Sequence, residues 1–222
     1  SVMADAKKGD SFMRQNRMKK CLTTVLSGIL VLSLSGCGQT AKLPEEVVNT
    51  SLVVEKDGKV ISYLVNTFDK DFYSLDGLEE MVKNEAEEFN AAHTDTPEEA
   101  LTVKTVQALD DGAMVQVVQE FDSADSYAEY NDQDLFYGTR VEALAQGSPV
   151  NKELVNAADG TPADPDKLEK ALEKGHLIIT NASAYIYCPY PVLYISEGVV
   201  MGEDGSVDAS QSDGVVTILM KK

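Results

Sequence analysis

Four tyrosines crowd into one short stretch near the C-terminal end: Tyr185, Tyr187, Tyr190 and Tyr194. An exposed tyrosine can stack its ring on a sugar or a peptide, while its hydroxyl makes a hydrogen bond. Because strand side chains alternate between two faces, Tyr185 and Tyr187 share one face of a strand. The core of a β-sandwich would show the same spacing. The pattern therefore predicts either a binding face or a core.

A single arginine, Arg140, occurs in residues 37–222. Its planar guanidinium can bond two carboxylate oxygens at once. Among so many acids, we expect it to hold a partly buried pair of carboxylates at the start of a short helix. Arg140 therefore joins the candidate binding residues, and Arg140→Ala is expected to lower the melting temperature.

Histidine and cysteine show no pattern for metal or nucleophilic chemistry. His93 and His176 lie far apart, without the neighbouring Cys or His residues that a zinc site of about four ligands needs. Cys188 lies in a segment rich in Tyr and Pro with no cationic base beside it. We expect it to be a small buried hydrophobe rather than a catalytic thiol. The sequence thus predicts no catalytic residue, no metal and no cofactor.

Acidic side chains form two weaker patterns. Residues 204–210 place oxygen-bearing side chains at alternate positions, as calcium loops do, but Val215 stands where such a loop has its bidentate glutamate. We expect a polar hairpin turn there. Neighbouring acids, such as Asp110 and Asp111, could form a catalytic carboxylate pair. Such pairs arise by chance in a chain with 37 Asp and Glu, so they indicate little.

A cationic and then apolar stretch dominates the N-terminal region. Two adjacent lysines precede residues 22–35, which carry no charge over 14 residues. This length fits the apolar core of a signal peptide and is shorter than the ~20 residues that span a bilayer as a helix. Small residues follow, and then Cys37, whose thiolate can act as a nucleophile. Residues 18–36 are therefore expected to be a signal peptide, and residues 1–17 an extension that fits no signal design.

The segment Leu34-Ser35-Gly36-Cys37 resembles the lipobox of bacterial lipoproteins, and residues 37–222 as a whole resemble a group of such lipoproteins from gut clostridia and their relatives. Beyond the lipobox, the likeness is carried by residues 63–73, 135–139 and 192–198. In lipoproteins a diacylglyceryl group is joined to the cysteine sulfur, the preceding peptide is removed, and the lipid chains include palmitate. The resemblance implies lipid attachment at Cys37 on the extracytoplasmic face of the cell membrane. It implies no particular activity.

Charge narrows the range of partners. The chain has 19 Lys and Arg against 37 Asp and Glu, a formal net charge of −18. Without residues 1–36, which hold six cations and two acids, the charge becomes −22. Such a surface repels phosphate backbones, so no nucleic acid partner is expected. It is also repelled by an anionic membrane, which suits a body held by a lipid anchor.

Periodicity predicts the elements that position these residues. Two strands, 51–55 and 60–68, flank an Asp-Gly turn, and residues 75–92 show the apolar spacing of an amphipathic helix. A second hairpin follows in 101–121. The predicted fold is α+β: an antiparallel sheet of two β-hairpins packed on an amphipathic helix, followed by short helices and a β-rich C-terminal part.

The remaining elements are shorter. Helices are expected at 123–131, 139–145 and 165–174, a turn at 134–138, and strands at 177–181, 184–188, 192–196 and 215–220. The predicted divisions are an extension (1–17), a signal peptide (18–36), a flexible tether (37–50), an α+β domain (51–147), an exposed connection (148–164), and a helix with a β-rich C-terminal unit (165–222).

These features lead to one expected function and two alternatives. The chain is expected to be a membrane-anchored extracytoplasmic lipoprotein that acts as a non-enzymatic binding or envelope-interaction module. Its partners would be the membrane, through the lipid on Cys37, and a glycan, peptide or envelope protein. The alternatives are an extracytoplasmic hydrolase that uses a carboxylate pair and an accessory lipoprotein of a membrane transporter. The sequence leaves the oligomeric state open.

Overall fold

The computed structural model describes residues 42–70, 73–94 and 99–222. The predicted extension, the predicted signal peptide and Cys37 lie outside this part of the chain. The elements follow in this order: β1 (Ser51–Val54), β2 (Val60–Thr67), α1 (Leu75–Ala92), β3 (Leu101–Leu109), a 3-10 turn (Asp110–Gly112), β4 (Met114–Phe121), α2 (Ala124–Asn131), β5 (Leu135–Gly138), α3 (Arg140–Gln146), β6 (Leu154–Asn156), α4 (Pro165–Lys174), β7 (His176–Thr180), β8 (Tyr185–Tyr187), β9 (Val192–Ser196), β10 (Val200–Met201), β11 (Val207–Asp208) and β12 (Val216–Met220).

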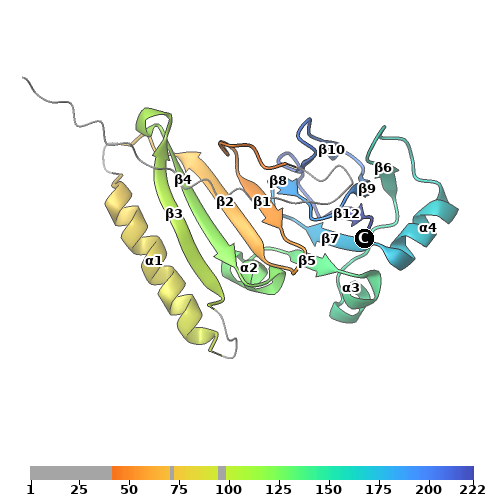
Figure 1. Ribbon diagram of the computed structural model, residues 1–222, viewed down its shortest axis with the longest axis horizontal. Coiled ribbons are helices and arrows are strands. Elements are labelled where there is room, and N and C mark those ends of the chain that lie inside the picture. The colour runs from red at the N-terminus through yellow and green to blue at the C-terminus, as the bar shows by residue number, and fades with distance from the viewer. Residues whose placement is uncertain (1–41, 71–72, 95–98) are drawn as a thin grey trace, which may run out of the picture. The chain divides into compact units, whose positions relative to one another are not determined.

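The strands form two sheets, which we call sheet A and sheet B. Sheet A has seven strands in the order β10-β11-β8-β1-β2-β4-β3, and sheet B has five in the order β5-β7-β12-β9-β6. In sheet A, β1 pairs in parallel with β8, whereas its other neighbour, β2, is antiparallel. Figure 1 shows the two sheets and the strand-rich C-terminal part. The prediction of a mixed α and β class with a β-rich C-terminal part is confirmed.

Two hairpins make up one half of sheet A. β1 pairs with β2 across a turn in which Gly58 has a φ of 96°, a conformation that glycine adopts readily. β3 pairs with β4 across the 3-10 turn, and β2 pairs with β4 to join the hairpins. α1 packs against β3, with Val82 and Ala86 as its buried residues (Figure 1). The Ser74 hydroxyl caps the helix by accepting a hydrogen bond from the Gly77 N–H.

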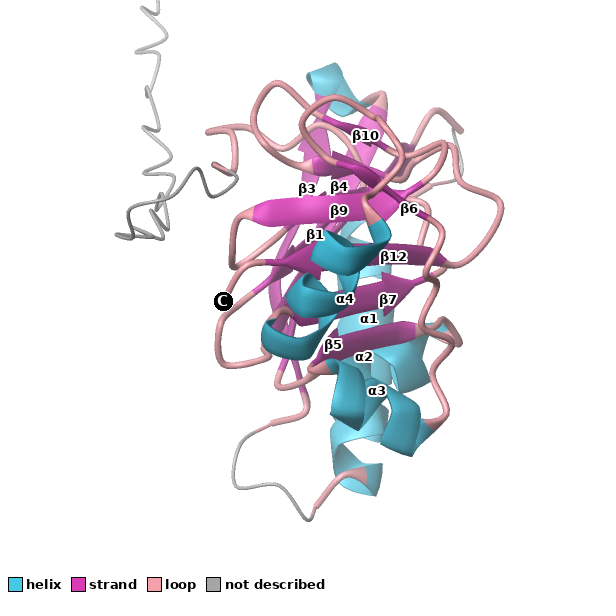
Figure 2. Cartoon of the chain, turned by 90° about the vertical axis from the view of Figure 1, so that its right-hand side faces the viewer, coloured by secondary structure: helices cyan, strands magenta, loops and turns pink. Residues whose placement is uncertain are grey.

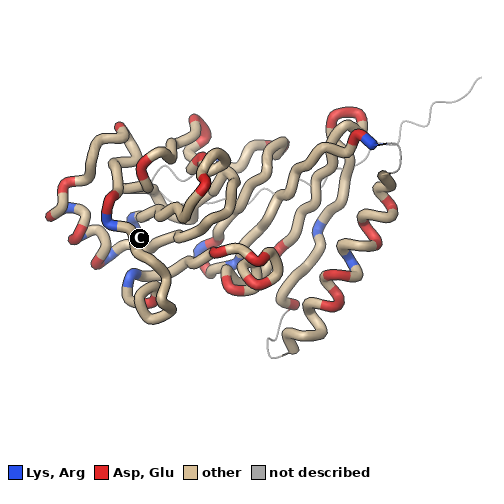
Figure 3. Tube along the Cα trace, turned by 180° about the vertical axis from the view of Figure 1, so that it is seen from behind, with Lys and Arg blue, Asp and Glu red and all other residues tan. Residues whose placement is uncertain are grey.

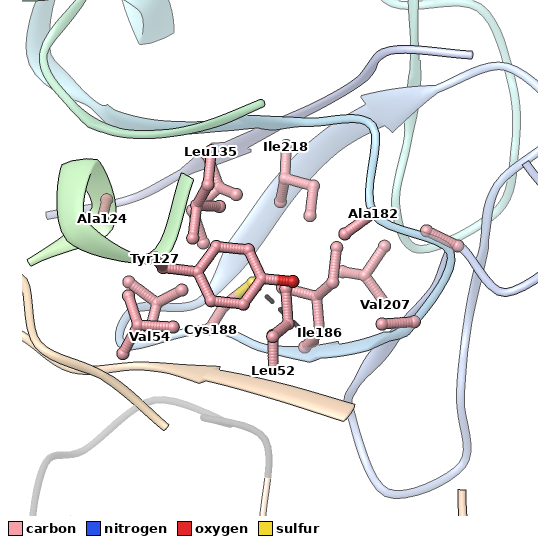
Figure 4. Packing of buried hydrophobic residues seen from close by; sticks show 14 of the residues in the cluster. Leu52, Val54, Ala124, Tyr127, Leu135, Ala182, Ile186, Cys188, Val207 and Ile218 are labelled. Carbon is pink, nitrogen blue, oxygen red and sulfur yellow. Dashed lines mark hydrogen bonds between the residues drawn. The ribbon is translucent and has the colours of Figure 1, made fainter. Parts of the chain in front are cut away.

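The inner faces of the two sheets share one core. Leu52 and Ile186 come from sheet A, Ile178 and Ile218 come from sheet B, and each side chain is at most 1% exposed. Figure 4 shows Leu52, Ile186 and Ile218 near the ring of Tyr127. Burial of each such side chain contributes roughly 1.5–3 kcal/mol relative to exposure, so this core is what holds the sheets together.

The other face of sheet B is covered by helices. Leu168 and Leu172 of α4 pack on Leu177 of β7 and Leu219 of β12, and Figure 2 shows α4 lying across these strands. α4 covers the residues predicted to be helical, and it begins with Pro165, which suits the first turn because proline lacks the N–H that this position leaves unpaired. The helix therefore presents one apolar stripe to the sheet.

Gly175, which follows α4, is required for close approach rather than for a left-handed turn. Its φ of −84° and ψ of 176° are extended values that any residue can adopt. A Cβ atom on Gly175 would lie 2.5 Å from the Met220 carbonyl oxygen and 2.8 Å from that of Ala171. The absence of a side chain here lets the end of α4 meet the end of β12.

Two sequence predictions were wrong in detail. Residues 134–138 were expected to be a turn, but Leu135–Gly138 forms β5 and pairs with β7 at the edge of sheet B. The stretch 148–164, expected to be an exposed connection, contains β6, whose Leu154 is 3% exposed and packs under α4. In both cases three or four residues suffice for a strand because a neighbouring strand is already in place to pair with them.

The sheets do not divide at residues 148–164. Sheet B takes β5 from before this stretch and β7, β12 and β9 from after it. Sheet A takes β8, β10 and β11 from the C-terminal part and places β8 beside β1. Residues 51–147 and 165–222 therefore complete each other's sheets.

Candidate binding groove

The outer face of sheet A carries a small apolar cluster, which we call the outer cluster. It consists of Val53, Ile61, Val118 and Tyr187, with Leu43, Tyr63 and Tyr185 packed against it. Pairing of β8 with β1 aligns Tyr185 with Ser51 and Tyr187 with Val53. Because alternate residues share a face, this register places both tyrosine side chains on the outer face.

A groove of about 290 Å³ lies beside these two tyrosines. Three parts of the chain form its walls: β8, the segment before β1, and the loop between β10 and β11. The segment supplies Glu46 and Val47, and the loop supplies Asp204. We call this site the groove. The sequence prediction that Tyr185 and Tyr187 share one face is confirmed, and both line this surface hollow.

A hydrogen bond fixes one wall of the groove. The Tyr187 hydroxyl donates to Oδ2 of Asp204 over 2.7 Å, and the Ser206 N–H and hydroxyl both donate to Oδ1. Burial raises the pKa of Tyr187, and the bond to Asp204 raises it further. Burial acts to raise the pKa of Asp204, but the bonds from Ser206 and Tyr187 outweigh it and leave the pKa below its ordinary value. Asp204 is therefore an anion at neutral pH.

The groove carries negative charge. Glu46, Glu203 and Asp204 line it, and none of the lining residues that the structure describes is Lys, Arg or His. Figure 3 shows how widely Asp and Glu are spread over the chain, including the long helix α1 and many of the loops. Aromatic rings beside carboxylates suit a neutral or cationic ligand and disfavour an anionic one.

The other two tyrosines lie elsewhere. Tyr194 is 8% exposed and packs under α4 on the far face of sheet B. The ring of Tyr190 lies near Lys56, whose Nζ is 5.6 Å from the ring centroid, and near His176, whose ring is 5.7 Å away. The cluster of four in the sequence is therefore two groove residues, one core residue and one aromatic neighbour of His176.

Arg140 also lies apart from the groove. It begins α3, and its Nη1 bonds Oε1 of Glu169 on α4, so it links two helices on the outer side of sheet B. Lys152 approaches the other oxygen of Glu169 at 3.9 Å. The arginine bond and burial act in opposite directions on Glu169, and the bond prevails and lowers its pKa. The structure thus gives Arg140 one half-exposed carboxylate partner where a partly buried pair was expected.

The two histidines and Cys188 lie outside the groove, where they make hydrogen bonds or pack within the fold. His93 bonds the Phe89 carbonyl through Nδ1 and the Glu129 carboxylate through Nε2, which raises its pKa. Burial lowers the pKa of His176. Cys188 is 3% exposed in the shared core, as expected, and burial raises the pKa of its thiol to about 12 (Figure 4). Its sulfur is therefore a thiol, not a thiolate, at neutral pH.

The loop at 204–210 forms two local turns. Asp208 accepts hydrogen bonds from the N–H and hydroxyl of Ser210, just as Asp204 does from Ser206. Of the residues that the structure describes, no group of three or more His, Cys, Asp or Glu could hold a metal ion. Likewise, none of the described helices combines the length and apolarity needed to cross a membrane.

Several groove residues were not anticipated from the sequence. Val47 is 7% exposed and Ser51 is 1% exposed, yet both lie in or beside a stretch that reads as a polar tether. The one available signal was Val47-Val48, an apolar pair inside that stretch. A pair of this kind is too short to show any periodicity.

The described residues thus define a mixed α and β protein of two sheets, with a tyrosine-lined acidic groove on the outer face of sheet A. No family model, curated protein or solved structure matches the chain.

Proposed function

We propose that this chain is a lipid-anchored extracytoplasmic lipoprotein, attached through Cys37, that binds a neutral or cationic glycan or peptide in the groove. The observation that carries the binding proposal is the pair Tyr185 and Tyr187 beside three carboxylates in one hollow. The lipobox-like residues before Cys37 carry the location. Neither argument depends on the other.

The groove is better suited to binding than to hydrolysis. Asp204 already accepts hydrogen bonds from Ser206 and Tyr187, which hold its carboxylate in one orientation. The same bonds keep its pKa low, whereas a general acid at neutral pH needs a raised one. The half-buried ring of Tyr185 and the fixed carboxylate acceptors instead offer stacking and hydrogen bonding, the usual means of holding a sugar or a peptide, while Tyr187, 6% exposed, forms the floor beside it.

Titration of the full chain with a ligand panel tests the binding proposal. Each glycan and peptide is offered in neutral, cationic and anionic forms. Binding is expected for neutral or cationic members, with loss in Tyr185→Ala and retention in Tyr190→Ala, the matched tyrosine outside the groove. A preference for anionic ligands, equal losses in both variants, or turnover of any ligand abolished by one Asp or Glu change would contradict it.

Labelled fatty acid tests the location. Cells that express the chain are expected to incorporate label into the wild type and none into Cys37→Ser. Equal labelling of both forms, or an N-terminus upstream of residue 37 in the mature protein, would refute the anchor while leaving the groove unaffected.

A further inference from the structure

The segment before β1 is attached to the body at several points. Its first described residue, Lys42, donates its N–H to the Asp204 carbonyl over 3.1 Å. Leu43 packs on the outer cluster, and Val47 is 7% exposed. The Gln116 side chain donates from Nε2 to the Val47 carbonyl over 2.6 Å. We call residues 42–50 the arm.

The arm ends at β1 with two further contacts. The Thr50 hydroxyl donates to the Val65 carbonyl, and the Val65 N–H donates back to the same hydroxyl, both over 3.2 Å. Attachments therefore occur at the start, the middle and the end of the arm. A stretch that reads as a free tether in the sequence is in fact one wall of the groove.

Docking of the arm shortens the link to the lipid. Five residue steps separate Cys37 from Lys42, which at about 3.6 Å per residue span at most about 18 Å. A link that stayed free up to residue 50 would span up to about 47 Å. A body of this size has a radius of gyration of roughly 16 Å. The longer link would let the body turn through a wide range of orientations, whereas the shorter one keeps Lys42 within about 18 Å of Cys37.

We propose that the arm holds the outer face of sheet A, with its groove, toward the membrane surface. This proposal rests on the proposed lipid attachment at Cys37. The partner surface is the headgroup layer of a zwitterionic bilayer. The acids of the groove would be repelled by anionic lipids, so proximity here comes from the short link rather than from charge attraction.

Two exposed valines on different layers report this orientation. Val200 of β10 is 59% exposed and pairs with Asp208, which pairs with Tyr185, so it shares the outer face of sheet A. Val141 of α3 is 77% exposed, and α3 lies beyond sheet B, two layers and roughly 20 Å away. The chain contains no tryptophan. Val200→Trp and Val141→Trp therefore each introduce a single reporter.

The test uses the full chain, processed in cells, purified and reconstituted into phosphatidylcholine vesicles that carry spin-labelled headgroups. Spin labels quench tryptophan fluorescence only at short range. Several-fold stronger quenching is expected for Val200→Trp than for Val141→Trp. A second pair of variants carries a Gly/Ser insertion of about twelve residues after Thr40, which lengthens the link without altering the arm. With the insertion, the two tryptophans are expected to be quenched to the same extent.

Each other outcome overturns the proposal. Equal quenching of the two reporters would show that the body has no preferred face. Stronger quenching of Val141→Trp would show that the opposite side faces the bilayer. A difference that survives the insertion would show that surface attraction, not the short link, sets the orientation. Failure to float with the vesicles would refute the lipid anchor itself, an outcome that flotation detects separately from quenching.

Discussion

The hydrogen bond between Tyr187 and Asp204 gives the most direct test of the groove's construction. Tyr187→Phe removes only the hydroxyl that donates to Asp204 over 2.7 Å. A hydrogen bond to a charged group contributes about 1.5–3 kcal/mol. Because Asp204 is exposed and keeps its bonds from Ser206, we discount the loss for solvent screening to about 1 kcal/mol. For a domain of this size that lowers the melting temperature by roughly 2–4 °C.

The matched control is Tyr185→Phe. This tyrosine lies on the same face two residues earlier, and no hydrogen bond from its hydroxyl is found among the described residues. Its removal is expected to change stability by less than about 0.5 kcal/mol. Thermal unfolding followed by far-UV circular dichroism at neutral pH measures both variants. Equal losses in the two, or no loss in Tyr187→Phe, would refute the reasoning.

The same pair has a defined pH dependence. The pKa of Asp204 is lowered in the folded state. Its contribution to the free energy of unfolding is therefore complete above the ordinary pKa of 3.8 and is lost as the pH falls through the lowered pKa. The pKa of Tyr187 is raised in the folded state. Its contribution to the free energy of unfolding is therefore complete below pH 10.0, its ordinary pKa, and is lost as the pH rises through the raised pKa. The difference in melting temperature between wild type and Tyr187→Phe should therefore be constant between these two pH limits and become smaller outside them.

Three further predictions concern other parts of the fold. Gly175→Ala would place a Cβ 2.5 Å from a β12 carbonyl oxygen, so a loss of about 1–3 kcal/mol is expected in urea unfolding, whereas Gly214→Ala, with nothing within 4 Å, should be neutral. The backbone and carboxylate bonds of His93 raise its pKa, so wild type should exceed His93→Gln in melting temperature below pH 6.5 and lose this advantage as the pH rises through the raised pKa. Arg140→Ala should lower the melting temperature slightly at low salt and not at high salt, because its bond to Glu169 is partly exposed; no change at low salt would contradict this.

Local sequence signals were sufficient for the helices and the hairpins. The cap at Ser74, the proline at the start of α4 and the glycine-bearing turn between β1 and β2 all act over a few residues, and the turn and both helices are found where predicted. The hairpin predicted in residues 101–121 is likewise found, with β3 as its first strand. Such features are determined by neighbouring residues, so a single sequence is enough to reveal them.

Pairings between distant segments could not be predicted in the same way. The sequence predicts a turn at residues 134–138 because so few residues between polar segments show no period, and only pairing with β7 makes residues 135–138 a strand. The parallel pairing of β1 with β8 leaves no local trace at all. One of the three groove walls was missed for the same reason, since the segment before β1 is held by a distant residue, Gln116, whose side chain bonds the Val47 carbonyl.

The position of β1 has a consequence for how the chain folds. Its partners are β2, which follows it directly, and β8, which comes about 130 residues later. Until β8 arrives, one side of β1 is an open edge of four apolar-rich residues that could join another chain. A ribosome-bound or truncated chain that stops before Tyr185 should consequently remain prone to aggregation. Refolding should then be slow and concerted, because sheet A is complete only when β8 has paired with β1, far away in the sequence.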